Sequence, residues 1–145
     1  MDRILVVCVG NICRSPLGER LLKQALPDRF SVSSAGIAAV VGHAADATML
    51  DVAAGHDVSL DGHVARQFSA GIGAAHDLIL VMEAGHKTEI TRLAPQIGGR
   101  CLLFDRWTGA KGIADPYRRP RAAHETAYAE IAAATSAWVA RLSRG

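Results

Sequence analysis

The sequence has no long hydrophobic run, few aromatic residues and no strong excess of charge. None of its apolar stretches approaches the ~18 residues that a membrane-spanning helix needs, so we expect no membrane insertion. Lysine and arginine total 16 and aspartate and glutamate total 14, a net charge of +2 that is too small to indicate a nucleic-acid partner. The amino-terminal segment MDRILVVCVG has no small-residue cleavage site and does not resemble a secretory signal peptide. The composition is that of an ordinary globular domain.

Cysteine is also scarce, and the three present are Cys8, Cys13 and Cys101. An odd number of cysteines forms no disulfide framework and is ordinary in a reducing compartment, so we expect a cytoplasmic protein. The six histidines include no HxxH or HxxxH pair and no Cys/His pair accompanies Cys8 and Cys13, so we expect no metal. We interpret Cys101 as a core residue. Five histidines are interpreted as surface or capping residues: His43, His56, His76, His86 and His124.

Apolar, β-branched segments alternate with segments of helical periodicity, without repeats or linkers. We predict strands over residues 3–9, 30–36, 76–83 and 100–104. Helices are expected after Pro16, after a capping Asp46, near residues 84–93 and from about residue 121 to 142. This alternation predicts one α/β domain over residues 1–145, with a four-stranded parallel sheet covered by helices on both faces in a flavodoxin-like or Rossmann-like three-layer sandwich. Functional loops are then expected at the carboxyl ends of the strands.

The segment VCVGNICRSP joins the first strand to the first helix and has the composition of an anion-binding loop. Successive backbone N–H groups and the helix N-terminus supply positive potential there. Gly10 and Asn11 tolerate the backbone conformations that such a loop requires. Arg14 adds a planar guanidinium that can hold two oxygens of a tetrahedral oxyanion. The residues expected to surround the anion are Val9, Gly10, Asn11, Ile12, Cys13 and Ser15.

Cys8 stands at the bottom of this loop. Alone, a cysteine in a strand is more often a core residue, but the Cys-x5-Arg-Ser string before a proline favours a nucleophile. The positive potential of the loop favours the thiolate form of Cys8, and Ser15 can donate a hydrogen bond to the sulfur. The arrangement predicts phosphoryl transfer to cysteine without a metal.

The segment ADPYRRP supplies the acid that hydrolysis of an aryl phosphate needs. Asp115 can protonate the leaving phenolate and then activate water, and Pro116 restricts its backbone to extended geometry. Tyr117 can form one wall of a slot for an aromatic substrate. The basic residues nearby, which favour an anionic peptide, are Arg118, Arg119 and Arg121.

The sequence resembles the low-molecular-weight protein tyrosine phosphatases, in particular the bacterial exopolysaccharide-associated branch, over essentially its whole length. The resemblance rests on VCVGNICRSP, SAG at residues 34–36, HVARQ at 63–67, DLILVME at 77–83 and DPYR at 115–118. It implies that Cys8 is the nucleophile, that Arg14 clamps the phosphoryl group and that Asp115 is the general acid and base. It also implies a four-stranded parallel sheet and no cofactor.

The resemblance assigns further roles. Asn11, Ser34 and His63 match the polar network that holds the loop in shape, and Ser15 would assist the thiolate. Ile12, Val40 and Tyr117 would line the substrate slot, with the aliphatic Ile12 favouring phosphotyrosine. Cys13 matches a second cysteine that can form a reversible disulfide with Cys8. The implied partner is a phosphotyrosine protein, an autophosphorylated bacterial tyrosine kinase or its substrates, and we expect a monomer or weak self-association.

Two alternatives remain open on the residues. An arsenate reductase of the same fold needs two further redox cysteines around the third strand and its helix, and MEAGHKTEITRLAP has none. A non-catalytic phosphotyrosine-binding module would most simply lack Cys8 or Asp115, and both are present.

Overall fold

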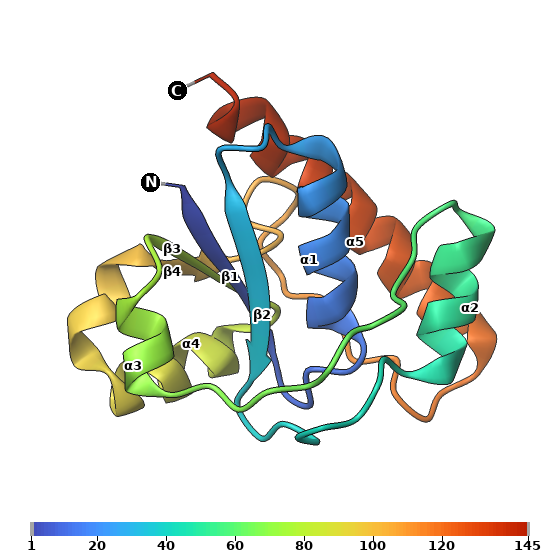
Figure 1. Cartoon of the computed structure of the whole chain (residues 1–145), viewed down its shortest axis with the longest axis horizontal. Helices are drawn as coiled ribbons and strands as arrows, with labels where there is room; N and C mark the ends of the chain where they lie inside the picture. Colours follow the sequence, from blue (N-terminus) through green and yellow to red (C-terminus); the bar gives the residue numbers. More distant parts are fainter. Residues whose placement is uncertain (1, 145) are drawn as a thin grey trace.

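The computed structural model describes residues 2–144 and contains the predicted parallel sheet (Figure 1). Its strands are β1 (Arg3–Cys8), β2 (Ser31–Gly36), β3 (Leu78–Val81) and β4 (Cys101–Leu103), in the spatial order β2-β1-β3-β4. All three neighbouring pairs are parallel. The predicted α/β fold class is therefore confirmed.

The helices form the two outer layers. One side carries α1 (Arg14–Ala25), α2 (Ala47–Gly55) and α5 (Arg121–Leu142), while α3 (Ala70–Ala74) and α4 (Ala84–Leu93) lie on the other (Figure 1). A 3₁₀ helix, η1 (Pro95–Arg100), leads into β4. No helix in the described part of the chain combines the length and hydropathy of a membrane span.

β1 is central and buried on both faces, which explains its continuous apolar sequence. Ile4 and Val6 point into the core under α1, α2 and α5, whereas Leu5 and Val7 point into the core with α4 and η1. Each of these four side chains is fully buried. The alternation places Cys8, two residues beyond Val6, on the α1 side at the carboxyl end of the strand.

Local signals set the helix boundaries. Asp46 caps α2 as predicted, because its carboxylate accepts from the backbone N–H of Met49 at 3.0 Å. Pro95 follows the end of α4 and begins η1. α3 was not predicted; it is five residues long and contains two glycines, which have low helix propensity.

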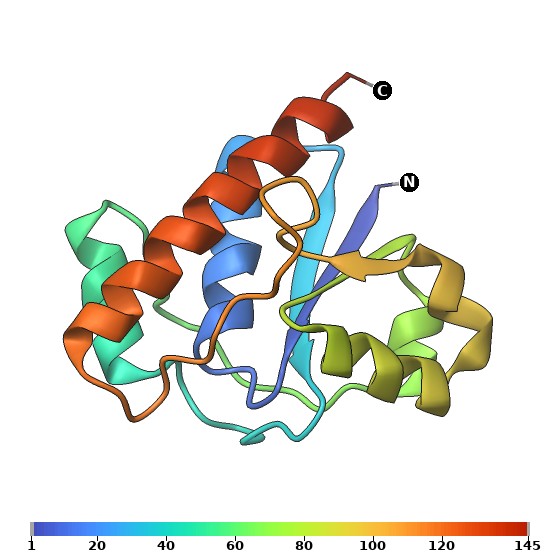
Figure 2. The ribbon, with the colours of Figure 1, turned by 180° about the vertical axis from the view of Figure 1, so that it is seen from behind.

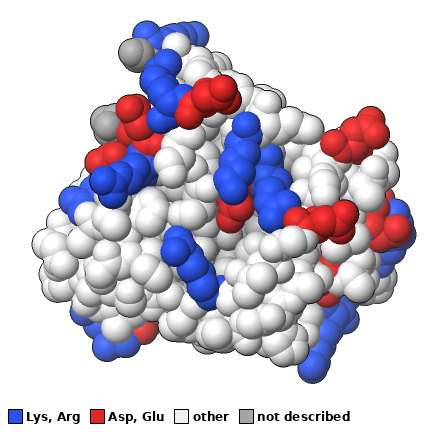
Figure 3. Space-filling model, in the orientation of Figure 1, with Lys and Arg blue, Asp and Glu red and all other residues white. Residues whose placement is uncertain are grey.

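The carboxyl edge of the sheet gathers four connections. Residues 9–13 follow β1, residues 37–46 follow β2, α4 follows β3, and a long loop over residues 104–120 joins β4 to α5 (Figure 2). The face shown in Figure 3 has lysine and arginine interspersed with aspartate and glutamate, in line with the small net charge. The candidate residues Cys8, Arg14 and Asp115 all come from this carboxyl edge.

Candidate active site

The loop of residues 9–13 turns its carbonyls outward. The carbonyls of residues 8, 9, 10 and 12 accept hydrogen bonds from the backbone N–H groups of residues 37, 38, 40 and 46, at 2.7–3.0 Å. The carbonyl of Asn11 accepts from Nε2 of His63 at 2.6 Å. Because a peptide group is planar and trans, the N–H groups of residues 9–13 point the opposite way, into the loop. The predicted ring of inward amides is therefore present.

Cys8 lies at the bottom of this ring, almost fully buried, with its Sγ 2.9 Å from the Oγ of Ser15. That hydroxyl oxygen already accepts a hydrogen bond from Nδ2 of Asn11 at 2.8 Å, so its own proton is free to point at the sulfur. Ser15 is thus placed to donate to Cys8, as predicted.

Asn11 connects the loop to the two neighbouring segments. It has a φ of 56°, in the left-handed region that the sequence analysis expected, and its side chain is fully buried. Its Nδ2 also donates to the Oγ of Ser34 at 3.0 Å, and its Oδ1 accepts from the backbone N–H of Arg66 at 2.9 Å. The structure therefore brings together the three residues expected to support the loop, Asn11, Ser34 and His63.

Glu19 completes this network and was not predicted from the sequence. The Oγ of Ser34 donates to its Oε1 at 2.6 Å, and Lys23 donates to its Oε2 at 3.0 Å. Burial by itself would raise the pKa of Glu19, but the hydrogen bonds from Ser34 and Lys23, with the charges of Lys23 and Arg20, outweigh it and hold the pKa below its usual value. The sequence signal that could have identified Glu19 is its position one helical turn after Ser15, on the same face of α1.

Arg14 is buried to 1% exposure and is held by one end of its guanidinium. Its Nη1 donates to Oε2 of Glu83 and to the carbonyl of Ile113, both at 2.6 Å. Its Nε has no hydrogen-bond partner among the described residues, and Nη2 lies 3.7 Å from Oδ2 of Asp115. A buried donor of this kind indicates a ligand, so Nε and Nη2 form the fork available to two oxyanion oxygens.

Glu83 was not predicted to take part in the site. It is the residue before α4, and its backbone N–H donates to Nδ1 of His86 at 3.2 Å. Burial, together with the charge of Arg14, holds the pKa of His86 below its usual value, so this ring stays neutral beside the guanidinium. Glu83, which follows the neighbouring strand β3, therefore holds the guanidinium of Arg14 in a fixed orientation.

A cavity of about 160 Å³ opens above the loop and contains the remaining candidates. Its Asp115 carboxylate is 43% exposed and accepts from the backbone N–H of Tyr117 at 3.0 Å, which orients it. Ile12, Val40 and Tyr117, the residues expected to form the substrate slot, all line this cavity. The full lining is Cys8, Val9, Gly10, Ile12, Cys13, Arg14, Ala38, Val40, Asp115 and Tyr117.

The other two thiols differ from Cys8 in their surroundings. Burial raises the pKa of Cys13, and the charges of Asp46, Cys8 and Asp115 add to the effect, so its free thiol stays protonated. Cys101 lies in the core beneath α4, where burial raises its pKa to about 11. All three cysteines are free, and the Cys8–Cys13 disulfide stays a prediction.

The fold and the site together define a class of protein. They are those of an α/β protein whose loop can receive a tetrahedral oxyanion beside a cysteine thiol, with a carboxylate at the opening of the same cavity. Residues 3–145 match the family described as low molecular weight phosphotyrosine protein phosphatase. The chain belongs to that family, which confirms the predicted resemblance.

Individual relatives agree over nearly the whole length. The low molecular weight protein-tyrosine-phosphatase Etp of Escherichia coli K12 is 50% identical over 143 residues, covering 99% of this chain and 96% of Etp. The probable low molecular weight protein-tyrosine-phosphatase AmsI of Erwinia amylovora is 49% identical over 144 residues, covering 99% of both chains. The structure of Vibrio vulnificus Wzb in complex with benzylphosphonate superposes with a TM-score of 0.94 at 44% identity, covering 97% of this chain and 98% of Wzb.

Proposed function

We propose that the protein hydrolyses phosphotyrosine in proteins through a cysteinyl-phosphate intermediate. The observation that carries the proposal is the half-anchored guanidinium of Arg14, whose Nε has no hydrogen-bond partner within residues 2–144 and lies beside the ring of inward amides. The relatives Etp and AmsI, which are named as protein-tyrosine phosphatases, support it. The arsenate reductase alternative has no comparable support, because the segment around α4 contains no cysteine.

In the first step the phosphoryl group occupies the loop. The sulfur of Cys8 attacks phosphorus, the bond from phosphorus to the tyrosyl oxygen breaks, and Asp115 transfers its proton to the leaving phenolate. Arg14 and the loop amides hold the charge on the three equatorial oxygens. Ser15 stabilises the thiolate before the attack, through its contact of 2.9 Å.

In the second step the roles at the cavity opening reverse. The Asp115 carboxylate takes a proton from water, the water oxygen bonds to phosphorus, and the sulfur–phosphorus bond breaks. Inorganic phosphate leaves and Cys8 returns to the thiolate. One exposed carboxylate therefore serves both steps.

The walls of the cavity favour an aromatic substrate. Ile12 and Val40 are apolar and Tyr117 offers a ring face, so a planar phenyl group can stack between them while its phosphate reaches Cys8. The ligand of Vibrio vulnificus Wzb, benzylphosphonate, also joins an aromatic ring to a tetrahedral phosphorus group. Phosphotyrosine is the substrate that this combination fits.

Two variants test the mechanism. Cys8→Ser is expected to abolish turnover of a phosphotyrosine peptide. Asp115→Ala is expected to lower kcat by about 10²–10⁴-fold on that peptide and by less on para-nitrophenyl phosphate, whose leaving group needs less protonation. Asp28→Ala, which removes an exposed aspartate just after α1, is the matched control. Equal losses on the two substrates would remove Asp115 from the acid role.

The partner follows from the same chemistry. We place the protein in the cytoplasm, where three free thiols stay reduced, and infer an autophosphorylated bacterial tyrosine kinase or its substrates as the phosphotyrosine partner. The Asp115→Ala variant should retain this partner in a pull-down from lysate, read by mass spectrometry. Capture of proteins without phosphotyrosine would contradict the assignment. Self-association stays a prediction of monomer or weak association.

A further inference from the structure

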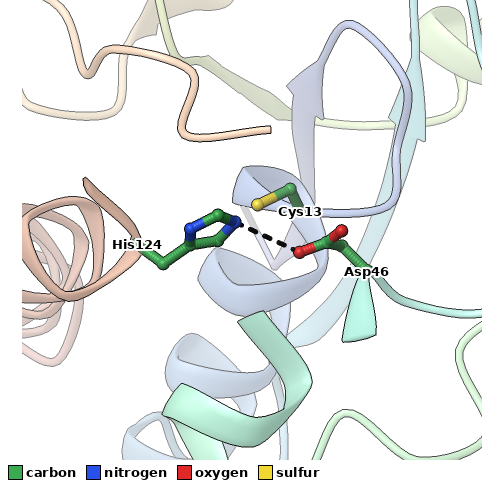
Figure 4. A group of neighbouring side chains, drawn as sticks. All are labelled: Cys13, Asp46 and His124. Carbon is green, nitrogen blue, oxygen red and sulfur yellow. Dashed lines mark ion pairs between the residues drawn. The ribbon is translucent and has the colours of Figure 1, made fainter. Parts of the chain in front are cut away.

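Three helix N-termini meet behind the anion loop and bring a thiol, a carboxylate and an imidazole together (Figure 4). Cys13 precedes α1, Asp46 precedes α2, and His124 is in the first turn of α5. The sulfur, one carboxylate oxygen and one ring nitrogen all lie within 4.8 Å of one another. Cys13 and His124 are buried, and the Asp46 side chain is 16% exposed.

The interpretation of His124 as a surface or capping residue is wrong, because its side chain is buried at 1% exposure and α5 has no side-chain cap hydrogen bond at its N-terminus among the described residues. Its Nδ1 lies 3.2 Å from the carbonyl of Pro120, which can only accept, so the ring carries a proton on Nδ1. Its Nε2 has no hydrogen-bond partner among the described residues, yet it faces Oδ2 of Asp46 at 3.3 Å. A buried nitrogen lone pair and a carboxylate that face each other require a cation between them or a second proton on the ring.

The separation of the His124 and Asp46 ligand atoms matches that between two ligands of one metal ion. Zinc bonds of about 2.0 Å to nitrogen and 2.0–2.2 Å to oxygen place the two ligand atoms about 3.3 Å apart in a tetrahedron. The distance from Nε2 of His124 to Oδ2 of Asp46 is 3.3 Å. The zinc–sulfur bond of about 2.3 Å requires separations of roughly 3.6 Å, so the Cys13 sulfur, which lies within 4.8 Å of the other two atoms, would move by up to roughly 1 Å.

We propose that Cys13, Asp46 and His124 form a buried site for one divalent transition-metal ion of the zinc class. Thiolate and imidazole ligands favour such an ion over Mg²⁺ or Ca²⁺. On binding, the metal–sulfur bond replaces the S–H bond of Cys13 and the proton leaves to solvent, so one thiolate and one carboxylate balance the two positive charges. The hydrogen bond from Nδ1 of His124 to Pro120 is the outer contact that orients a ligating histidine.

The site has a consequence for the loop. A metal-bound Cys13 thiolate is tied to the starts of α2 and α5 and is withheld from Cys8. The loop that carries Asp115, residues 104–120, leads directly into the start of α5. The ion would therefore connect the loop of residues 9–13 to the carboxyl end of the loop of residues 104–120, which contains Asp115.

Cobalt binding to the Cys8→Ser protein tests the proposal without relying on activity, since this variant lacks the competing nucleophilic thiol. We expect one Co²⁺ per chain with a sulfur-to-metal charge-transfer band in the near ultraviolet, displaced by Zn²⁺. The band should disappear on adding Cys13→Ser and persist on adding Cys101→Ser. Cys8→Ala serves as a second background if the serine variant is poorly folded by circular dichroism.

The other two ligands provide the decisive comparison. Loss of an outer contact alone weakens metal binding by about 10–100-fold, so His124→Gln and Asp46→Asn should each weaken it by roughly 100-fold or more. His56→Gln is the matched control, because His56 faces a carboxylate of Glu125 at 3.4 Å on the surface. Absence of the band, or unchanged affinity in both ligand variants, would overturn the proposal and leave a doubly protonated His124 paired with Asp46.

Discussion

Replacement of Asn11 tests whether the anion loop is held by its buried polar network. The side chain makes three hydrogen bonds, to the Oγ atoms of Ser15 and Ser34 and from the backbone N–H of Arg66, at 2.8–3.0 Å. Asn11→Ala removes all three at a fully buried position. At about 0.5–1.5 kcal/mol for each bond, the loss is roughly 3 kcal/mol.

The backbone adds a second contribution. At a φ of 56° alanine is strained, whereas asparagine tolerates this conformation and glycine adopts it freely. A left-handed conformation costs an ordinary residue about 1–2 kcal/mol, so Asn11→Ala should lose roughly 4 kcal/mol in total. Asn11→Gly loses the same hydrogen bonds without the strain and should lose about 3 kcal/mol.

Urea unfolding, followed by tryptophan fluorescence, measures both variants, with Trp138 buried as the probe. The expected order of stability is wild type, then Asn11→Gly, then Asn11→Ala. The order is informative because alanine normally stabilises a helix or strand relative to glycine. The reasoning is refuted if either variant loses less than about 1 kcal/mol, or if the glycine variant is the less stable of the two.

Three further changes test the surrounding framework. Gly36→Ala places a Cβ against the carbonyl oxygen of Val9, so we expect a loss of about 1–3 kcal/mol in urea unfolding and reduced turnover. Folding lowers the pKa of Glu19, so the ionised carboxylate stabilises the folded state at pH values above its usual pKa of 4.5. This stabilisation is lost as the pH falls through the lower pKa of the folded state. The difference in unfolding free energy between wild type and Glu19→Gln should therefore shrink over that pH range. Trp138→Phe removes the hydrogen bond of 2.7 Å to the carbonyl of Phe104 and should destabilise by about 1–3 kcal/mol, measured by circular dichroism.

Each of these changes has a control or a contradicting result. Gly55→Ala adds a Cβ that meets no atom of the described residues within 4 Å, so it should be neutral or slightly stabilising. A pH-independent difference between wild type and Glu19→Gln would contradict the pKa argument. Trp107→Phe alters a tryptophan that is 41% exposed, and an effect as large as that of Trp138→Phe would show that the buried hydrogen bond is not the cause.

The sequence predicted the elements whose signals are local. The apolar, β-branched run identified β1, Asp46 marked the start of α2, and Asn11 was recognised as a residue that tolerates a left-handed φ. The strand predicted over residues 76–83 was too long, because the structure limits β3 to Leu78–Val81, and Met82 is the one apolar residue of the remainder. An apolar sequence indicates that a segment is buried, whereas the bounds of a strand are set by its hydrogen-bonded pairing with an adjacent strand.

Elements stabilised from a distance were missed. α3 depends on the Ser69 side chain, which accepts from the N–H of Ile72, and on Gly73, where a Cβ would press against Ile97 and Phe68. Its own sequence gives little helical signal because helix nucleation in so short a segment is unfavourable. Tertiary packing decides such elements.

The site likewise combines features that the local sequence predicts with contacts that depend on the tertiary structure. The spacing from Cys8 to Arg14 and Ser15 predicted a thiol beside a loop of inward amides, because one strand end, one turn and one helix start are consecutive in the chain. The sequence did not determine that Glu83 anchors Arg14, 69 residues away, or that Glu19 supports Ser34. Nor did it place His124 beside Cys13 and Asp46. Those contacts exist only because a parallel sheet brings the carboxyl ends of its strands, and the helices that follow them, to one edge.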